Sequence, residues 1–365
     1  MPYKIPQLIP YVGKEELENL KKVIANQWLT EGPFTEEFVS LIKDVTGAKY
    51  ALPVTNGTMA LFLAVLSLGI GPGDEVIVPD FTFIASATSV HFAGARPVFC
   101  DVTDDTFTID TDKLEERITE KTKAIMPVHV YGQSADMAPV LQMARAHNLT
   151  VIEDAAQGFG VFYNNKHTGT LGDVGMISFF ADKTITTGEG AVILTNREDV
   201  YERAKLIRNQ GRSSSGVFIH PALGMNFRMT DLQSAIGVAQ IKKFNEIKRL
   251  KSRNYALYRR ELSGVKELKF LEEVSHSNLV PFRTNVLAED KEDLCKHLEE
   301  NGIQTRSFFF PLHRQPCFNF LGYREEEFPV SNRGFEQGLS LPVYCGLQKK
   351  DILNICSRIK EHYGY

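Results

Sequence analysis

The sequence predicts an α/β fold, with a large domain built on a mostly parallel sheet and a smaller α+β domain at the C-terminus. Over the first two thirds of the chain, strand-like runs that are apolar throughout alternate with helical patterns. Such alternation is typical of a sheet that helices cover on both faces. A long helical pattern then runs from Thr230 to Leu262 and leads into the C-terminal part. The 365 residues, 43% of them hydrophobic, suffice for one large core and a smaller second one.

The predicted elements follow in chain order. A helix around Glu15–Asn26 comes first, and the loop Asn56–Thr58 opens an apolar helix over Met59–Ile70. A helix over Ala138–His147 supplies a crossover between strands, and Thr230 with Asp231 can cap the start of the long helix. The predicted strands are Glu75–Pro79, Arg96–Asp101, Ala124–Val130, Thr150–Asp154, Gly175–Phe180 and Ala191–Thr195.

Charge and composition argue against several classes of protein. The net charge of −4 comes from interspersed signs, which gives no basic surface for nucleic acid or a membrane. The apolar run Met59–Ile70 is about half as long as a membrane span, and the first residues lack the pattern of a signal peptide. Five scattered cysteines without a C-x-x-C pair fit reduced thiols in the cytoplasm. No two of the nine histidines lie three or four residues apart, so we expect no metal site.

A carboxylate and a lysine each follow an apolar strand in the middle of the chain. The run VIED ends at Asp154, and the run Met176–Phe180 delivers Lys183 into a polar loop with two glycines. A carboxylate can keep the ring nitrogen of pyridoxal phosphate (PLP) protonated, and a lysine can hold its aldehyde covalently and later move protons. Such a lysine must be neutral near pH 7, which burial beside a positive ring favours. The pair is what a PLP site with Lys183 as the catalytic residue requires, whereas each residue alone also fits a simpler role, a solvated lysine or an aspartate that caps the next helix.

The loop Asn56-Gly57-Thr58 in front of an apolar helix allows two interpretations. It is a simple helix cap, or its backbone N–H groups and the helix dipole also bind the phosphate of PLP. The two interpretations are compatible, and we expect the amides of Gly57 and Thr58 to contact the phosphate.

The ordered motifs EDAAQ, SFFADK, TTGEG, GMNFRMTDLQSAIG and FFFPLHRQP resemble the sugar aminotransferases of the DegT/DnrJ/EryC1/StrS family. The resemblance covers nearly the whole chain. It implies the aspartate-aminotransferase fold (fold type I) with a seven-stranded, mostly parallel sheet. It also implies an N-terminal segment (1–30) that packs with the small domain, a large PLP-binding domain (31–245) and a small C-terminal domain (246–365).

The resemblance further assigns the cofactor contacts. Lys183 and Asp154 take the roles described above, Phe83 lies over the ring of PLP, and Gln157 lies near the ring hydroxyl. Ser178 binds the phosphate from the strand that precedes Lys183. Asn226 reaches the phosphate from the neighbouring subunit, which implies a homodimer with shared active sites.

The substrate contacts that the resemblance implies lie on loops. His313 and Arg314 are placed near the sugar or its diphosphate, and Trp28 is placed at the mouth of the partner's site. Glu189 lies near Lys183. Simpler roles remain open, because Trp28 also fits a hydrophobic anchor and Glu189 a residue that fixes its loop.

A lysine rather than a histidine at position 183 favours amino transfer over dehydration in this family. The implied reaction moves an amino group from L-glutamate to a nucleotide-linked 4-keto-6-deoxyhexose, in the biosynthesis of a cell-surface polysaccharide or glycoconjugate. A 3-keto sugar, a UDP-linked or free keto-sugar, or a non-catalytic regulatory protein on this fold are the alternatives. A dinucleotide oxidoreductase is disfavoured, because Gly69-x-Gly71-x-Gly73 has the wrong spacing and follows a helical pattern.

Overall fold

A seven-stranded sheet forms the centre of the computed structural model, which describes residues 3–214, 216 and 218–365. Its strands are β1 (Tyr50–Val54), β2 (Glu75–Pro79), β3 (Arg96–Cys100), β4 (Thr122–Ile125), β5 (Thr150–Asp154), β8 (Val174–Ser178) and β9 (Ala191–Thr195). They lie in the order β1-β9-β8-β5-β4-β2-β3. Strands β8, β5, β4, β2 and β3 pair in parallel, and β9 is antiparallel to both of its neighbours. The predicted α/β class and its mostly parallel sheet are confirmed.

Helices cover both faces of this sheet, as the apolar strands require. One face carries α3 (Gly57–Ser67), α4 (Ala85–Phe92) and α6 (Glu198–Arg208), and the other carries α2 (Pro33–Thr46), α5 (Met137–Ala146) and α7 (Asp231–Lys242). Successive strand residues point to opposite faces. In β8, Met176 accordingly joins the core under α3, and Ile177 joins the core under α2 and α7.

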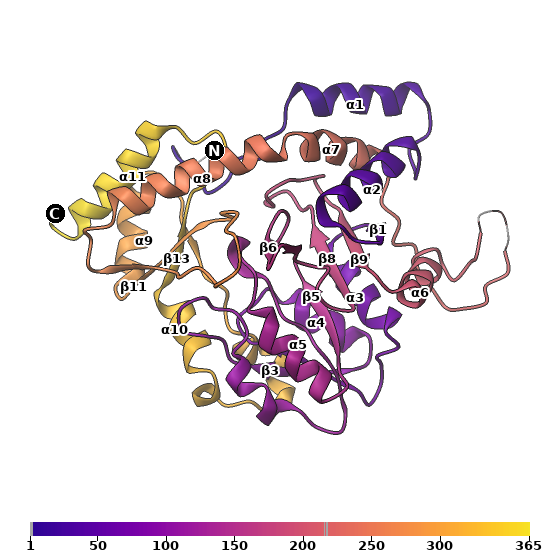
Figure 1. Ribbon diagram of the computed structural model, residues 1–365. Coiled ribbons are helices and arrows are strands. Elements are labelled where there is room, and N and C mark those ends of the chain that lie inside the picture. The colour runs from indigo at the N-terminus through magenta and orange to yellow at the C-terminus, as the bar shows by residue number, and fades with distance from the viewer. Residues whose placement is uncertain (1–2, 215, 217) are drawn as a thin grey trace.

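A second, four-stranded sheet builds the C-terminal unit. Its strands are β10 (Leu268–Phe270), β11 (Thr284–Ala288), β12 (Arg306–Ser307) and β13 (Gly338–Leu341), paired antiparallel in the order β10-β11-β13-β12. Helices α8 (Phe244–Glu261), α9 (Lys291–Glu300) and α11 (Lys349–His362) pack with it around one apolar core. Two further elements are the hairpin β6 (Phe162–Tyr163) and β7 (Lys166–His167), and helix α10 (Pro329–Gln337). In Figure 1, α8 leads from the large sheet to this unit.

The N-terminal segment differs in part from the expectation that it packs with the small domain. Helix α1 (Lys14–Ala25) lies along α7 beside the large sheet, where the Asn19 side chain donates to the carbonyl of Ala235 (Figure 1). The contact with the C-terminal unit is made earlier in the chain, by Ile5, which pairs with Ile303 and joins the core of that unit. The domain boundaries at residues 30 and 245 stay predictions.

Two predicted elements end or divide differently in the structure, and one strand was not predicted. The strand predicted over Ala124–Val130 ends at Ile125, because Pro127 has no N–H to donate to the neighbouring strand. The helix predicted over Thr230–Leu262 is divided at Lys243 into α7 and α8. Strand β1 was missing from the predicted set. Among the described residues, no helix is both long enough and apolar enough to cross a membrane.

Candidate active site

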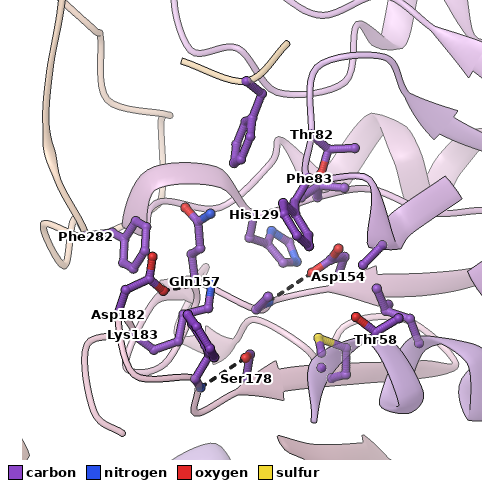
Figure 2. Close-up of a pocket in the computed structure, with 18 of the residues that line it drawn as sticks. Thr58, Thr82, Phe83, His129, Asp154, Gln157, Ser178, Asp182, Lys183 and Phe282 are labelled. Atoms are coloured by element: carbon purple, nitrogen blue, oxygen red, sulfur yellow. Dashed lines mark hydrogen bonds and ion pairs between the residues drawn. The ribbon is translucent and has the colours of Figure 1, made fainter. Parts of the chain in front are cut away.

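A cavity of about 800 Å³ opens at the carboxyl ends of the parallel strands. Its walls are formed by residues of the segments that follow β2, β4, β5 and β8, by the beginning of α3, and by the C-terminal unit. The carboxyl ends of parallel strands are where open α/β sheets bind ligands. Figure 2 shows Phe83, His129 and Asp154 toward one end of the cavity and Lys183 toward the other.

Asp154 is the last residue of β5 and lines the cavity, and both of its carboxylate oxygens accept hydrogen bonds. Its Oδ2 accepts a hydrogen bond from Ser86 Oγ at 2.7 Å, and its Oδ1 accepts one from the Ala156 N–H at 3.1 Å. The residue is 4% exposed. A buried carboxylate fixed in this way can make a strong charge-assisted hydrogen bond to a cationic ligand in the cavity.

Lys183 reaches the same cavity from the loop after β8. Its N–H donates to the Phe180 carbonyl at 2.9 Å, and its Nζ lies 3.7 Å from Asp182 Oδ1 (Figure 2). The loop returns to β9 through Gly190, whose φ of 155° and close approach to Thr187 leave no room for a side chain. Burial lowers the pKa of Lys183, while the carboxylates of Asp182 and Asp154 act in the opposite direction. The amine is therefore easier to deprotonate than an exposed lysine.

A cradle for an anion lies at the first turn of α3. Asn56 caps the helix by accepting the Met59 N–H at 3.0 Å. Among the residues that the structure describes, the amides of Gly57 and Thr58 find no acceptor. A Cβ at Gly57 would lie 2.9 Å from Met176 Cε and 3.3 Å from Ser178 Oγ, so the missing side chain keeps the helix end close to β8. Free amides beside a hydroxyl suit a phosphate group.

Three more of the predicted residues line the cavity. Phe83 is 59% exposed and presents its ring to the cavity, beside His129 and Asp154 in Figure 2. Gln157 accepts the N–H of Tyr131 at 2.6 Å, which fixes its side chain at the cavity wall. Glu189 also lines the cavity, and its carbonyl accepts hydrogen bonds from Thr187 and Gln233.

Four predicted residues lie outside this cavity. Asn226 pairs through its backbone with Asn209, and Trp28 is 57% exposed with its Nε1 donating to the Glu31 carbonyl. His313 differs most from the expectation, because Asp80 accepts from its N–H and pairs with its Nδ1, both at 2.7 Å. That buried pair holds the ring behind the cavity wall rather than in it.

Arg314 is likewise turned away from the cavity. Its guanidinium lies 3.5 Å from Glu325 and over the ring of Phe310. Neither residue lines this cavity, so their predicted substrate contact stays a prediction. The position of His313 depends on a partner more than 200 residues away in the sequence, and that of Arg314 depends on local packing. The motif alone carries no information about either contact.

The sequence reasoning missed a buried pair behind Asp154. His129 follows β4 and lines the cavity, and its Nε2 lies 3.0 Å from Glu153. Its Nδ1 accepts the Ala135 N–H, so the neutral ring carries its proton on Nε2 and donates it to Glu153. Glu153 also accepts three backbone N–H groups, from Gly169, Leu171 and Gly172. The adjacency of Glu153 to Asp154 in EDAAQ was the one available signal.

The reasoning also missed the charged wall opposite Asp154. Asp182, Arg283 and Arg306 line the cavity, and the two arginines come from the C-terminal unit. Both arginines lie about 100 residues or more beyond Lys183 in the sequence. They become neighbours of the Lys183 loop only when the two units pack together, so the sequence gives no sign of the contact.

The residues present fit PLP. The anion cradle at Gly57 suits its phosphate, the buried carboxylate of Asp154 suits its ring nitrogen, and Lys183 has the amine that its aldehyde requires. The fold and the site thus define a fold type I aminotransferase that works with PLP. The chain matches the DegT/DnrJ/EryC1/StrS aminotransferase family over residues 10–360 and belongs to that family.

Known relatives extend this comparison over nearly the full length. The chain is 38% identical to GDP-perosamine synthase of Caulobacter vibrioides, with 98% of each chain covered. It is 35% identical to the enzyme of the same name from Escherichia coli O157:H7, with 99% of each covered. The Spr1654 protein of Streptococcus pneumoniae, solved in its PLP-form, is 25% identical and superimposes with a TM-score of 0.93 over 98% of each chain.

Proposed function

We propose that the protein transfers the amino group of L-glutamate to a nucleotide-linked 4-keto-6-deoxyhexose, for the biosynthesis of a cell-surface polysaccharide or glycoconjugate. The observation that carries the proposal is the placement of Asp154 and Lys183 in one cavity with a phosphate cradle. The sugar substrate is supported by the likeness to two GDP-perosamine synthases.

Bound PLP would supply an aldehyde for an amine and a protonated ring that withdraws electrons from the carbon being deprotonated. Asp154 would hold the proton at the ring nitrogen. Gly57, Thr58 and Ser178 would bind the phosphate, and Phe83 and Gln157 would hold the ring. Lys183 Nζ, whose pKa burial lowers, would take the proton from the α-carbon of the donor and later return one to the sugar carbon.

The test follows the amino group through both halves of the reaction. Protein loaded with PLP is treated with L-glutamate, freed of excess donor, and incubated with a panel of nucleotide keto-sugars, with products read by mass spectrometry. We expect a mass corresponding to an amino-sugar from the 4-keto-6-deoxyhexose, and none with Lys183→Ala. Amination of a 3-keto or free keto-sugar alone would overturn the sugar assignment, and no amination of any sugar would overturn the function.

A homodimer with shared active sites is part of this proposal. Asn226 and Trp28 lie outside the cavity of their own chain. The segment before Asn226 also exposes large apolar side chains: Phe218 is 84% exposed, Leu223 95% and Met225 54%. Exposed apolar groups of this size mark an interaction surface. A second copy of the chain would cover them and bring Asn226 to the neighbouring phosphate site.

Mixing two inactive variants tests the shared site directly. Lys183→Ala lacks the amine but keeps Asn226, and Asn226→Ala has the reverse defect. If each site combines Lys183 of one protomer with Asn226 of its partner, half of the dimers after refolding a mixture are mixed, and each has one intact site. We expect activity to rise to about a quarter of that of the native protein. No rise above the two separate variants would show that Asn226 serves its own chain or neither.

A further inference from the structure

The carboxylate of Asp182 lies directly beside the amine of Lys183. Asp182 Oδ1 is 3.7 Å from Lys183 Nζ, and Figure 2 shows the two side chains together at one end of the cavity. Asp182 Oδ1 is buried, and among the residues that the structure describes none donates a hydrogen bond to it. A buried carboxylate oxygen without a donor is unfavourable, so it needs a positive partner. The amine of Lys183 is the group that this oxygen faces.

The other oxygen of Asp182 is fixed by the C-terminal unit. Asp182 Oδ2 accepts a hydrogen bond from Arg283 Nη2 at 2.9 Å and one from Arg306 Nη1 at 3.2 Å. Arg283 precedes β11, and Arg306 lies on β12. Guanidinium groups stay charged at any working pH, so these two bonds keep the carboxylate ionised and orient its free oxygen toward Lys183.

The ring of Phe282 borders the same amine. Lys183 Nζ lies 5.1 Å from the centre of this ring, and the face of an aromatic ring attracts a cation. Asp182 and Phe282 therefore both favour a protonated amine at this place. The carboxylate of Asp154 is engaged elsewhere, because both of its oxygens accept hydrogen bonds from Ser86 and Ala156.

We propose that Asp182 is a positioning residue that holds the amine of Lys183 whenever this amine carries a proton. The inference rests on the proposed function, in which Lys183 takes up a proton and later gives one up. Between these two steps the buried amine is an ammonium and needs a counter-charge. Asp182 supplies that charge, and the two arginines hold it at the edge of the cavity.

Other charged groups also act on Lys183. Four groups lie on the elements packed around it: Asp182 on its own loop, Asp154 at the end of β5, Arg283 before β11, and Lys251 on α8 beside the ring of Phe282. Burial lowers the pKa of Lys183, Asp182 and Asp154 raise it, and Arg283 lowers it. Removing the charge of Asp182 should therefore make Lys183 lose its proton at lower pH.

The test measures the protonation of Lys183 in the full-length protein prepared without PLP. Trace acetic anhydride acetylates only neutral amines, and mass spectrometry gives the rate at Lys183 relative to that at the exposed Lys296, at several pH values. Asp182→Asn removes the charge and keeps the shape of the side chain. Asp44→Asn, at an exposed position on α2, is the matched control.

We expect Asp182→Asn to shift the pH profile of Lys183 to lower pH, so that acetylation at pH 7 is about 3- to 10-fold faster than in the native protein. Arg306→Gln removes one donor from the carboxylate at a half-exposed position, and should shift the profile to higher pH and slow acetylation about twofold. The control should follow the native profile.

Three results would overturn the proposal. A faster rate at every pH with an unmoved midpoint would show only easier access to Lys183. Shifts of both variants in the same direction would contradict a charge effect of Asp182. If Asp182→Asn does not fold, an unmoved profile in Arg306→Gln would decide against the proposal.

The half-reaction of PLP-loaded protein with L-glutamate tests the link to the reaction. Asp182→Asn should lower its maximal rate about tenfold, with little change in the L-glutamate concentration at half-maximal rate. An unchanged maximal rate would also overturn the proposal. If native protein does not react with L-glutamate while the acetylation profiles shift as expected, the proposed function fails and the contact of Asp182 with the Lys183 ammonium stands.

Discussion

Lys251 offers a quantitative test of how the cavity wall is supported. It lies on α8 behind the cavity, is 3% exposed, and donates to the carbonyl of Phe282 at 3.3 Å. Lys183 and Lys251 place their Nζ atoms 5.1 and 5.7 Å from the centre of the Phe282 ring. Burial lowers the pKa of Lys251 from 10.5 to about 8.

The sign and size of the effect follow from this pKa. Between pH 8 and 10.5 the folded state binds fewer protons than the unfolded state, so the free energy of unfolding rises with pH in this window. A difference of about 2.5 in pKa corresponds to about 3 kcal/mol. Below pH 8 the folded protein therefore carries the full cost of a buried ammonium. Replacing Lys251 with Met removes this cost and loses one hydrogen bond of about 1 kcal/mol.

We expect Lys251→Met to be about 2 kcal/mol more stable than native protein at pH 7, with the advantage gone near pH 10.5. Urea denaturation of the PLP-free proteins at several pH values between 7 and 10.5 measures this difference. Lys296→Met, an exposed position on α9, is the control and should track the native protein. A constant difference between variant and native protein across this range, or a less stable variant at pH 7, would refute the reasoning.

Two further substitutions test the cofactor site. Asp154→Asn keeps the shape of the side chain and its contact with Ser86 but removes the charge at the ring nitrogen. We expect kcat/KM to fall at least about a hundredfold, and the urea midpoint of unfolding to stay nearly unchanged. Turnover within a few-fold of the native protein would contradict the role of Asp154. Gly57→Ala places a Cβ 3.3 Å from Ser178 Oγ and should weaken PLP binding, measured by fluorescence titration, about tenfold. Gly264→Ala enters open space and is the control; equal affinities of the two variants would place the phosphate elsewhere.

The side chains that form the candidate cofactor site could be predicted because they lie at the carboxyl ends of apolar strands. Asp154, Ser178 and Lys183 lie at or just beyond the ends of β5 and β8, which are parallel neighbours, so their residues meet at one edge. Apolar runs identify such strands from the sequence alone. The placement of His313 could not be predicted, because the motif assigned an isolated histidine without its partner. Its partner, Asp80, is 233 residues away, and only folding brings the two together.

The sequence by itself determined the α/β class, the aminotransferase family and the pairing of a carboxylate with a lysine, because these depend on local periodicity and on motifs within short stretches. The tertiary structure decided which distant groups share the cavity with Lys183. Arg283 and Arg306 contact Asp182 only because the C-terminal unit packs over the carboxyl edge of the large sheet. Side-chain charges far apart in the chain carry no signal of their neighbours until burial and packing bring them within a few ångströms of each other.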